Sequence, residues 1–243
     1  MAEASAVFAA SSLPPAALGM TASWALAHEV ARWKLTSAWG TEDVWGMPRW
    51  RSAVGLVTQW VALPLLLLCA LLSPAWSETR TCDPAYGVFE WSFCLIFPLF
   101  LVADFIELRM GKMLTLHHVV CLVGHVGSVT LSAAAFPYYF TGVVCLELGG
   151  SASSSHVLWP QRVSPLAVRM LMTASNLSAA AAVAGWALVA MRTNALWAAC
   201  GSLACLILIA MRQKETLSSL ANDPIPVRKP DGGKTDGRPT PLM

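Results

Sequence analysis

Long apolar blocks constrain the fold of this chain more than any other feature of its sequence. They follow one another with short breaks that contain charged residues or proline. A transmembrane helix needs about 20 mostly apolar residues, whereas membrane β-strands are shorter and alternate in polarity. We therefore expect an all-α, polytopic transmembrane helical bundle of about seven spans. The expected spans are 16–33, 52–72, 88–108, 113–133, 137–159, 166–190 and 193–211.

Composition agrees with this class. Hydrophobic residues make up 56% of the chain and charged residues only 12%, about half the usual charged share of a soluble domain. The net charge of +2 does not favour a nucleic-acid partner. The seven cysteines include no CxxC pair. We therefore predict no bound metal and no other cofactor.

The distribution of lysine and arginine predicts the orientation in the membrane. Fourteen of the sixteen fall on one side of the expected spans, and only Arg80 and Arg192 fall on the other. Because cytoplasmic loops are enriched in these residues, the N-terminus is expected in the lumen or outside the cell and the C-terminus in the cytoplasm. The first apolar segment carries His28, Glu29 and Arg32 near its end, which leaves its insertion open.

Three regions follow from this pattern. Residues 1–48 hold the first span and a cytoplasmic loop, and residues 49–212 form the transmembrane core. Residues 213–243 are rich in proline, glycine and charge, so we expect a disordered cytoplasmic tail.

Ionisable residues within the spans are the functional candidates, because they are costly to place in a bilayer. Asp104, His117 and His118 are the predicted catalytic residues, and Glu147, His125, Ser151 and Ser154 are the predicted binding residues. By helical rise, the two histidines lie roughly 6–8 Å from the cytoplasmic start of their span. The whole set then lines a cavity open to the cytosol. The alternative for the histidine pair and Glu147 is a hydrogen bond that only specifies helix packing, and the alternative for Asp104 is a solvated position at the membrane interface.

The stretches FLVADFIELRMGKMLTLHHVVCLVGH and YYFTGVVCLELGGSASSSHVLW resemble the TLC domain. This domain is shared by translocon-associated TRAM proteins, ceramide synthases and small lipid-homeostasis proteins. The matching features are an aspartate late in one span, a paired histidine early in the next and a glutamate-leucine pair in the one after. They correspond to Asp104, His117-His118 and Glu147-Leu148.

The ceramide synthase subgroup implies N-acylation by acyl-CoA, with histidine acting as general base or acyl acceptor. That subgroup carries an acidic cluster after the histidines, where this chain reads ELGGSASSSH. The resemblance therefore implies a small TLC-domain protein of the non-synthase type, in the endoplasmic reticulum or another endomembrane, with the plasma membrane as the alternative. Its expected partners are membrane lipids or acyl-CoA.

Three functions remain open from the sequence. The first is a role in membrane lipid homeostasis, by binding a lipid or acyl-CoA or by acyl transfer. The second is a non-catalytic cargo receptor or translocation accessory. The third is a seven-span zinc hydrolase, which the distance of about 10 Å between His118 and His125 along the helix disfavours. Whether the protein is an enzyme, and whether it forms homo- or hetero-oligomers, is not decided by the sequence.

Overall fold

The computed structural model describes residues 13–39, 43–44, 47–73, 86–108, 112–131 and 133–222, and these residues form an all-α bundle. Its seven helical segments are α2 (Pro15–Trp39), a continuous helix made of α3 (Arg49–Val57), η1 (Thr58–Ala62) and α4 (Leu63–Leu71), α6 (Val88–Glu107), α7 (Lys112–Thr130), α8 (Phe136–Leu158), α9 (Pro165–Ala190) and α10 (Ala195–Asn222). A short 3₁₀ turn, η2 (Ala133–Ala135), precedes α8. Two-residue strands β1 (Asp43–Val44) and β2 (Met47–Pro48) pair antiparallel between α2 and α3.

Four of the helices in the described part are long and apolar enough to cross a membrane. They span Arg49–Leu71, Val88–Glu107, Pro165–Ala190 and Ala195–Ser218. The apolar part of α7, Leu114–Thr130, is shorter, and α2 and α8 are not among the four. The expected number of helices is thus confirmed, and a multi-pass membrane protein is indicated. Among the described residues, four of the seven expected spans are thus supported by length and composition.

The last helix ends later than the sequence predicted. Helix α10 continues to Asn222, past the expected end of the core at residue 212. Gln213 explains part of this extension, because it exchanges hydrogen bonds with Asn176 and Thr173 of α9 at 2.7 and 2.9 Å. Residues 223–243, Arg80 and Arg109, all used in the charge argument, lie outside the described residues.

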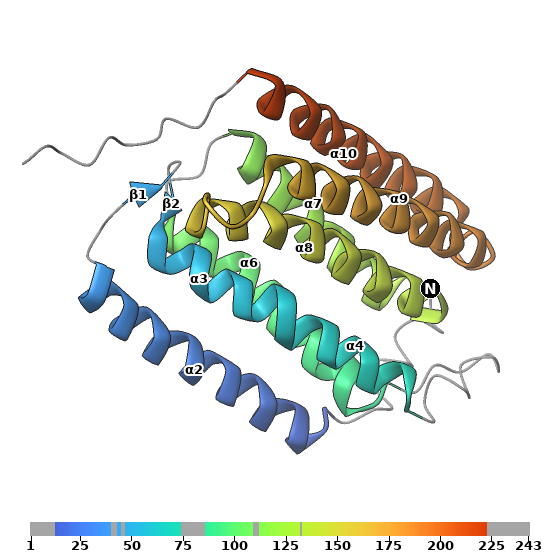
Figure 1. Ribbon diagram of the computed structural model, residues 1–243. Coiled ribbons are helices and arrows are strands. Elements are labelled where there is room, and N and C mark those ends of the chain that lie inside the picture. The colour runs from blue at the N-terminus through green and yellow to red at the C-terminus, as the bar shows by residue number, and fades with distance from the viewer. Residues whose placement is uncertain are drawn as a thin grey trace, which may run out of the picture.

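The helices run side by side, with α2 along one edge of the bundle and α10 along the opposite edge (Figure 1). The main core lies around α6 and α8, where four phenylalanines are almost fully buried: Phe93, Phe97, Phe136 and Phe140. The rings of Phe93 on α6 and Phe140 on α8 stack with centroids 3.8 Å apart. Aromatic packing of this kind fixes α6 against α8 and so positions the polar residues that both helices carry.

Small residues allow α8 and α9 to approach closely, as is usual between transmembrane helices. A Cβ added to Gly142 would lie 3.3 Å from Cβ of Ala182. At Gly149 an added Cβ would overlap the side chain of Ser175 and would lie 2.8 Å from Nη2 of Arg212. The hydroxyl of Ser175 donates to the carbonyl oxygen of Cys145 at 2.6 Å, which holds it in this place. Gly149 is therefore required by the packing of α8 against both α9 and α10.

Replacing Gly149 with alanine is expected to lower the free energy of unfolding by about 1–3 kcal/mol, because the methyl group overpacks this contact. Gly150→Ala is the matched control, since a Cβ there would meet its nearest atom, Nε2 of Gln59, at 3.5 Å. Thermal unfolding in detergent measures both variants. Equal stability of the two would contradict the close approach of α8, α9 and α10 at Gly149.

Candidate functional site

Arg51 is the centre of a buried ionic network. It lies in the first turns of α3 with a side chain only 2% exposed. Its Nε donates to Oδ1 of Asp104 on α6 at 2.6 Å, and its Nη2 also pairs with that oxygen. Nη2 donates to the carbonyl oxygen of Phe100 at 3.3 Å, and the guanidinium lies 4.6 Å from the centroid of the Phe100 ring. The charge of Asp104 is thereby compensated inside the bundle.

His118 completes this network from α7. Its Nε2 lies 2.8 Å from Oδ2 of Asp104, and its Nδ1 lies 2.9 Å from the carbonyl oxygen of Leu114. Both of these partners are acceptors, so both bonds form at once when both ring nitrogens carry a proton. Asp104 thus contacts Arg51 and His118 at once, and α3, α6 and α7 are tied together through one carboxylate.

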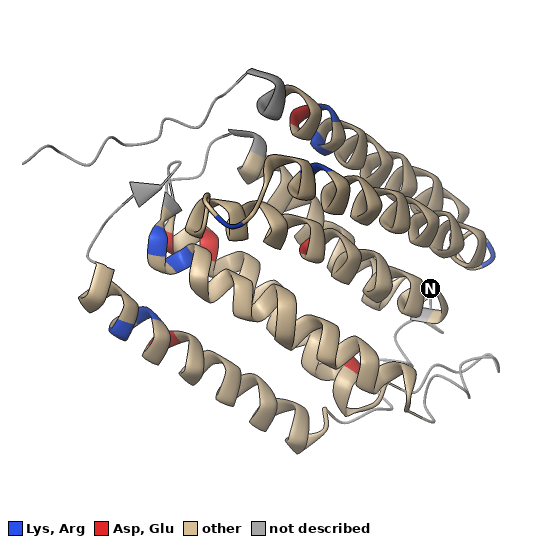
Figure 2. Cartoon of the chain, in the orientation of Figure 1, with Lys and Arg blue, Asp and Glu red and all other residues tan. Residues whose placement is uncertain are grey.

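The network continues to α2 at the same end of the bundle. Nη1 of Arg51 lies 3.5 Å from Nε2 of His28, while Glu107 lies 3.7 Å from Arg51 and 3.9 Å from Arg32. Figure 2 shows charged residues gathered where α3 begins and α6 ends. Ligand atoms of His28, Glu29 and Glu107 lie within 4.8 Å of one another, as a metal site would require. Arginines already neutralise both carboxylates, so this geometry is that of an ionic cluster.

His117 points away from this network. Successive residues of a helix diverge by about 100°, and the two histidine rings meet at 73° with centroids 5.6 Å apart. Nε2 of His117 lies 3.6 Å from Sγ of Cys121, one turn further along α7. Both residues line a cavity of about 340 Å³. The paired histidine is thus divided between a buried network and a cavity wall.

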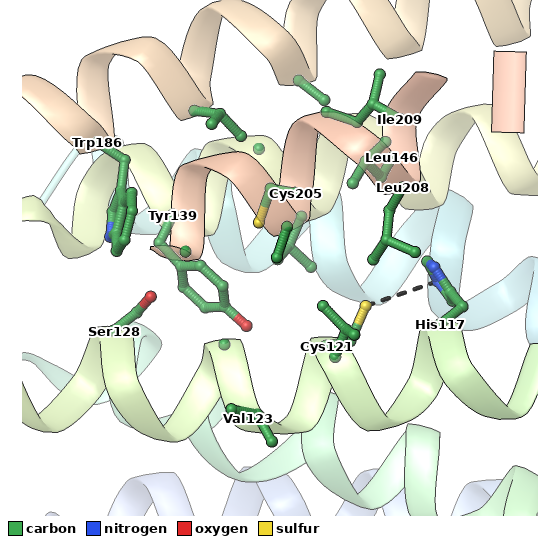
Figure 3. Close-up of a pocket in the computed structure, with 18 of the residues that line it drawn as sticks. His117, Cys121, Val123, Ser128, Tyr139, Leu146, Trp186, Cys205, Leu208 and Ile209 are labelled. Carbon is green, nitrogen blue, oxygen red and sulfur yellow. Dashed lines mark hydrogen bonds between the residues drawn. The ribbon is translucent and has the colours of Figure 1, made fainter. Parts of the chain in front are cut away.

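The cavity lies among α7, α8, α9 and α10 and is lined almost wholly by apolar groups. Figure 3 shows it extending from His117 past Cys121 and Tyr139 to Trp186. Arg212 borders it near the His117 end, where its Nη2 donates to the carbonyl oxygen of Leu146 at 2.7 Å. Two lining residues, Val119 and Tyr138, are 44% and 45% exposed, so the cavity reaches the outer surface of the bundle. Its volume is within the range of small-molecule sites.

The predicted binding residues lie outside this cavity lining. His125 is buried, with Nδ1 3.1 Å from the hydroxyl oxygen of Tyr139 and Nε2 3.0 Å from the carbonyl oxygen of Cys94. Glu147 accepts from Nε2 of Gln59 at 2.7 Å. Ser151 is fully buried and donates to the carbonyl oxygen of Leu148 at 2.5 Å.

Ser154 is half-buried on the same helix. Of the seven predicted site residues, the structure brings Asp104 and His118 together and places His117 alone at the cavity.

Sequence reasoning missed three residues that organise the site. Arg51 and Arg212 were used only as topogenic charges at span ends, although both reach back into the bundle. Gln59 lies in the π-helical turn η1, one turn before Pro64, whose missing N–H accounts for the irregular turn. A polar residue preceding a proline inside an apolar span was the signal available for Gln59.

Comparisons with protein-family models, with curated proteins and with solved structures found no match to this chain. The resemblance to the TLC domain therefore stays a prediction from the residues quoted above.

Proposed function

We propose that this multi-pass protein acts in membrane lipid homeostasis by binding the apolar chain of a lipid or acyl-CoA in the cavity among α7–α10. The observation that carries this proposal is an elongated cavity with apolar walls that has His117 and Arg212 at one end. For an acyl-CoA taken from the cytosol, each methylene that moves from water into the cavity contributes about 0.8 kcal/mol, so a chain of moderate length gains enough to bind. The polar part of the ligand lies at the His117 end.

The charge distribution supports an orientation for this site. With the lysine- and arginine-rich side in the cytoplasm, the N-terminus is lumenal or extracellular and the His117 end of the cavity faces the cytosolic leaflet. An acyl-CoA from the cytosol or a lipid from that leaflet then reaches the site. An endomembrane, such as the endoplasmic reticulum, is the compartment that suits this supply.

Acyl transfer is a second function that one observation favours. Nε2 of His117 lies outside the Asp104 network and at the end of the cavity where a carbonyl group would sit. An imidazole in that position can take a proton from an attacking group as a general base. Loss of acyl turnover in His117→Gln with unchanged chain binding would favour acyl transfer. Unchanged turnover in this variant would contradict a catalytic role of His117 and would leave chain binding as the proposed function.

A cavity-filling substitution tests the proposed function. Ala204 lines the cavity, whereas its neighbour Leu203 is 62% exposed. We expect Ala204→Phe to reduce labelling of the purified protein by a photoactivatable fatty acid at least about tenfold, a loss of about 1.4 kcal/mol in binding. Leu203→Phe, the matched control, should be labelled like the wild type.

Mass spectrometry of the labelled peptides should place the label on α7 and α10. Equal labelling of the two variants would contradict a chain-binding cavity. It would favour the cargo-receptor or translocation-accessory alternative, in which the polar residues only specify helix packing.

A further inference from the structure

Two tryptophans close the cavity at the end opposite His117. Trp186 of α9 is 6% exposed, and Trp197 of α10 packs against it edge to face, with ring centroids 6.3 Å apart at 81°. Both rings line the cavity, together with Ser128 of α7. Figure 3 shows Trp186 and Ser128 at this end. The two rings are large and rigid, so they form a fixed end wall of the cavity. We call this end wall, made of Trp186 and Trp197, the floor.

Two glycines make room for these rings. A Cβ added to Gly127 of α7 would overlap the indole of Trp197, and a Cβ added to Gly201 of α10 would lie 2.8 Å from Cη2 of Trp186. Any larger residue at either position would displace its ring from the floor. By contrast, an added Cβ at Gly124, which also lines the cavity, would meet nothing within 4 Å. The close glycine contacts are therefore found at the floor and not along the whole α7 wall.

We propose that Trp186 and Trp197 set the length of the single lipid chain that the cavity accepts. This inference rests on the proposed function and adds a selectivity to it. His117 and Ser128 are eleven residues apart on α7, which corresponds to roughly 16 Å along the helix. An extended saturated chain about as long as that of myristate fills this distance, and a longer chain meets the indole rings.

Substitutions of Trp197 by smaller residues should lengthen the cavity in steps. Purified protein is labelled with the photoactivatable fatty acid in competition with unlabelled decanoate, myristate or stearate. We expect myristate to compete best with the wild type. Trp197→Ala should move the preference to stearate by about tenfold in relative affinity, and Trp197→Phe should move it less. Trp159→Ala is the control, because Trp159 is 48% exposed and is not part of the cavity lining.

A substitution that shortens the cavity should shift the chain-length preference in the opposite direction, which a folding defect would not do. Ser128→Leu fills the same end of the cavity and should move the preference to decanoate. A uniform loss of affinity for all three acids in the tryptophan variants, or an unchanged preference, would overturn the proposal while leaving chain binding intact. Failure of every acid to compete with the wild type would instead contradict the proposed function itself.

Discussion

Replacing Asp104 with alanine is expected to lower the free energy of unfolding by about 3–5 kcal/mol. The carboxylate of Asp104 contacts both Arg51 and His118. The side chain of Arg51 is only 2% exposed, so the substitution leaves a buried guanidinium without its main counter-charge. Removing one partner of a buried ion pair lowers the free energy of unfolding by far more than the intact pair contributes to it, because the remaining charge stays desolvated. Asp104→Asn, which retains a hydrogen-bond acceptor, should lose less stability than Asp104→Ala.

Unfolding in detergent, followed by the loss of helical circular dichroism, measures this effect. Glu29→Ala is the matched control, because the carboxylate of Glu29 is 53% exposed and pairs with the exposed Arg32. An exposed pair contributes no more than about 1 kcal/mol. Equal stability losses for Asp104→Ala and Glu29→Ala would contradict the central position of Asp104 in the network.

The two histidines of the pair should respond differently to alanine. His118→Ala removes a buried ring with hydrogen bonds to Asp104 and Leu114, so we expect a loss of about 1–3 kcal/mol in the free energy of unfolding. His117→Ala removes a weak contact with the sulfur of Cys121 and the edge-to-face contact with the His118 ring, and should cost less than about 1 kcal/mol. His117→Ala should instead weaken binding of the lipid at its polar end.

Both properties can be measured on one preparation of each variant, with unfolding in detergent for stability and fatty-acid labelling for binding. The difference between the variants is the informative quantity. If both histidine variants lost stability equally and bound lipid equally, the division of the pair between network and cavity would be wrong.

Apolar run length was enough to predict the helices, and residue spacing was enough to bring Asp104 close to the paired histidine. Spacing could not decide which histidine meets Asp104, because adjacent residues diverge by about 100° and the rotation of α7 depends on its packing. That rotation is set by contacts distant in sequence, such as His125 of α7 with the carbonyl oxygen of Cys94 on α6.

The positions of Arg51 and Arg212 could not be predicted from the sequence either. A lysine or arginine near a span end is expected at the membrane surface, and the charge count treated Arg51 and Arg212 in that way. The structure turns both inward, because Asp104 and the carbonyl oxygen of Leu146 offer partners there. Helix α10 likewise continues beyond the apolar run because α9 provides partners for Gln213. Such pairings depend on which helices are neighbours, and composition does not encode that directly.

An experimental density map of the protein in lipid nanodiscs tests the chain-binding cavity most directly. We expect elongated density among α7–α10 that begins beside His117 and ends at the rings of Trp186 and Trp197. The same map of Ala204→Phe should lack this density while the helices keep their positions. A wild-type map in which side chains fill this space, or in which it holds no elongated density, would contradict lipid-chain binding at this site.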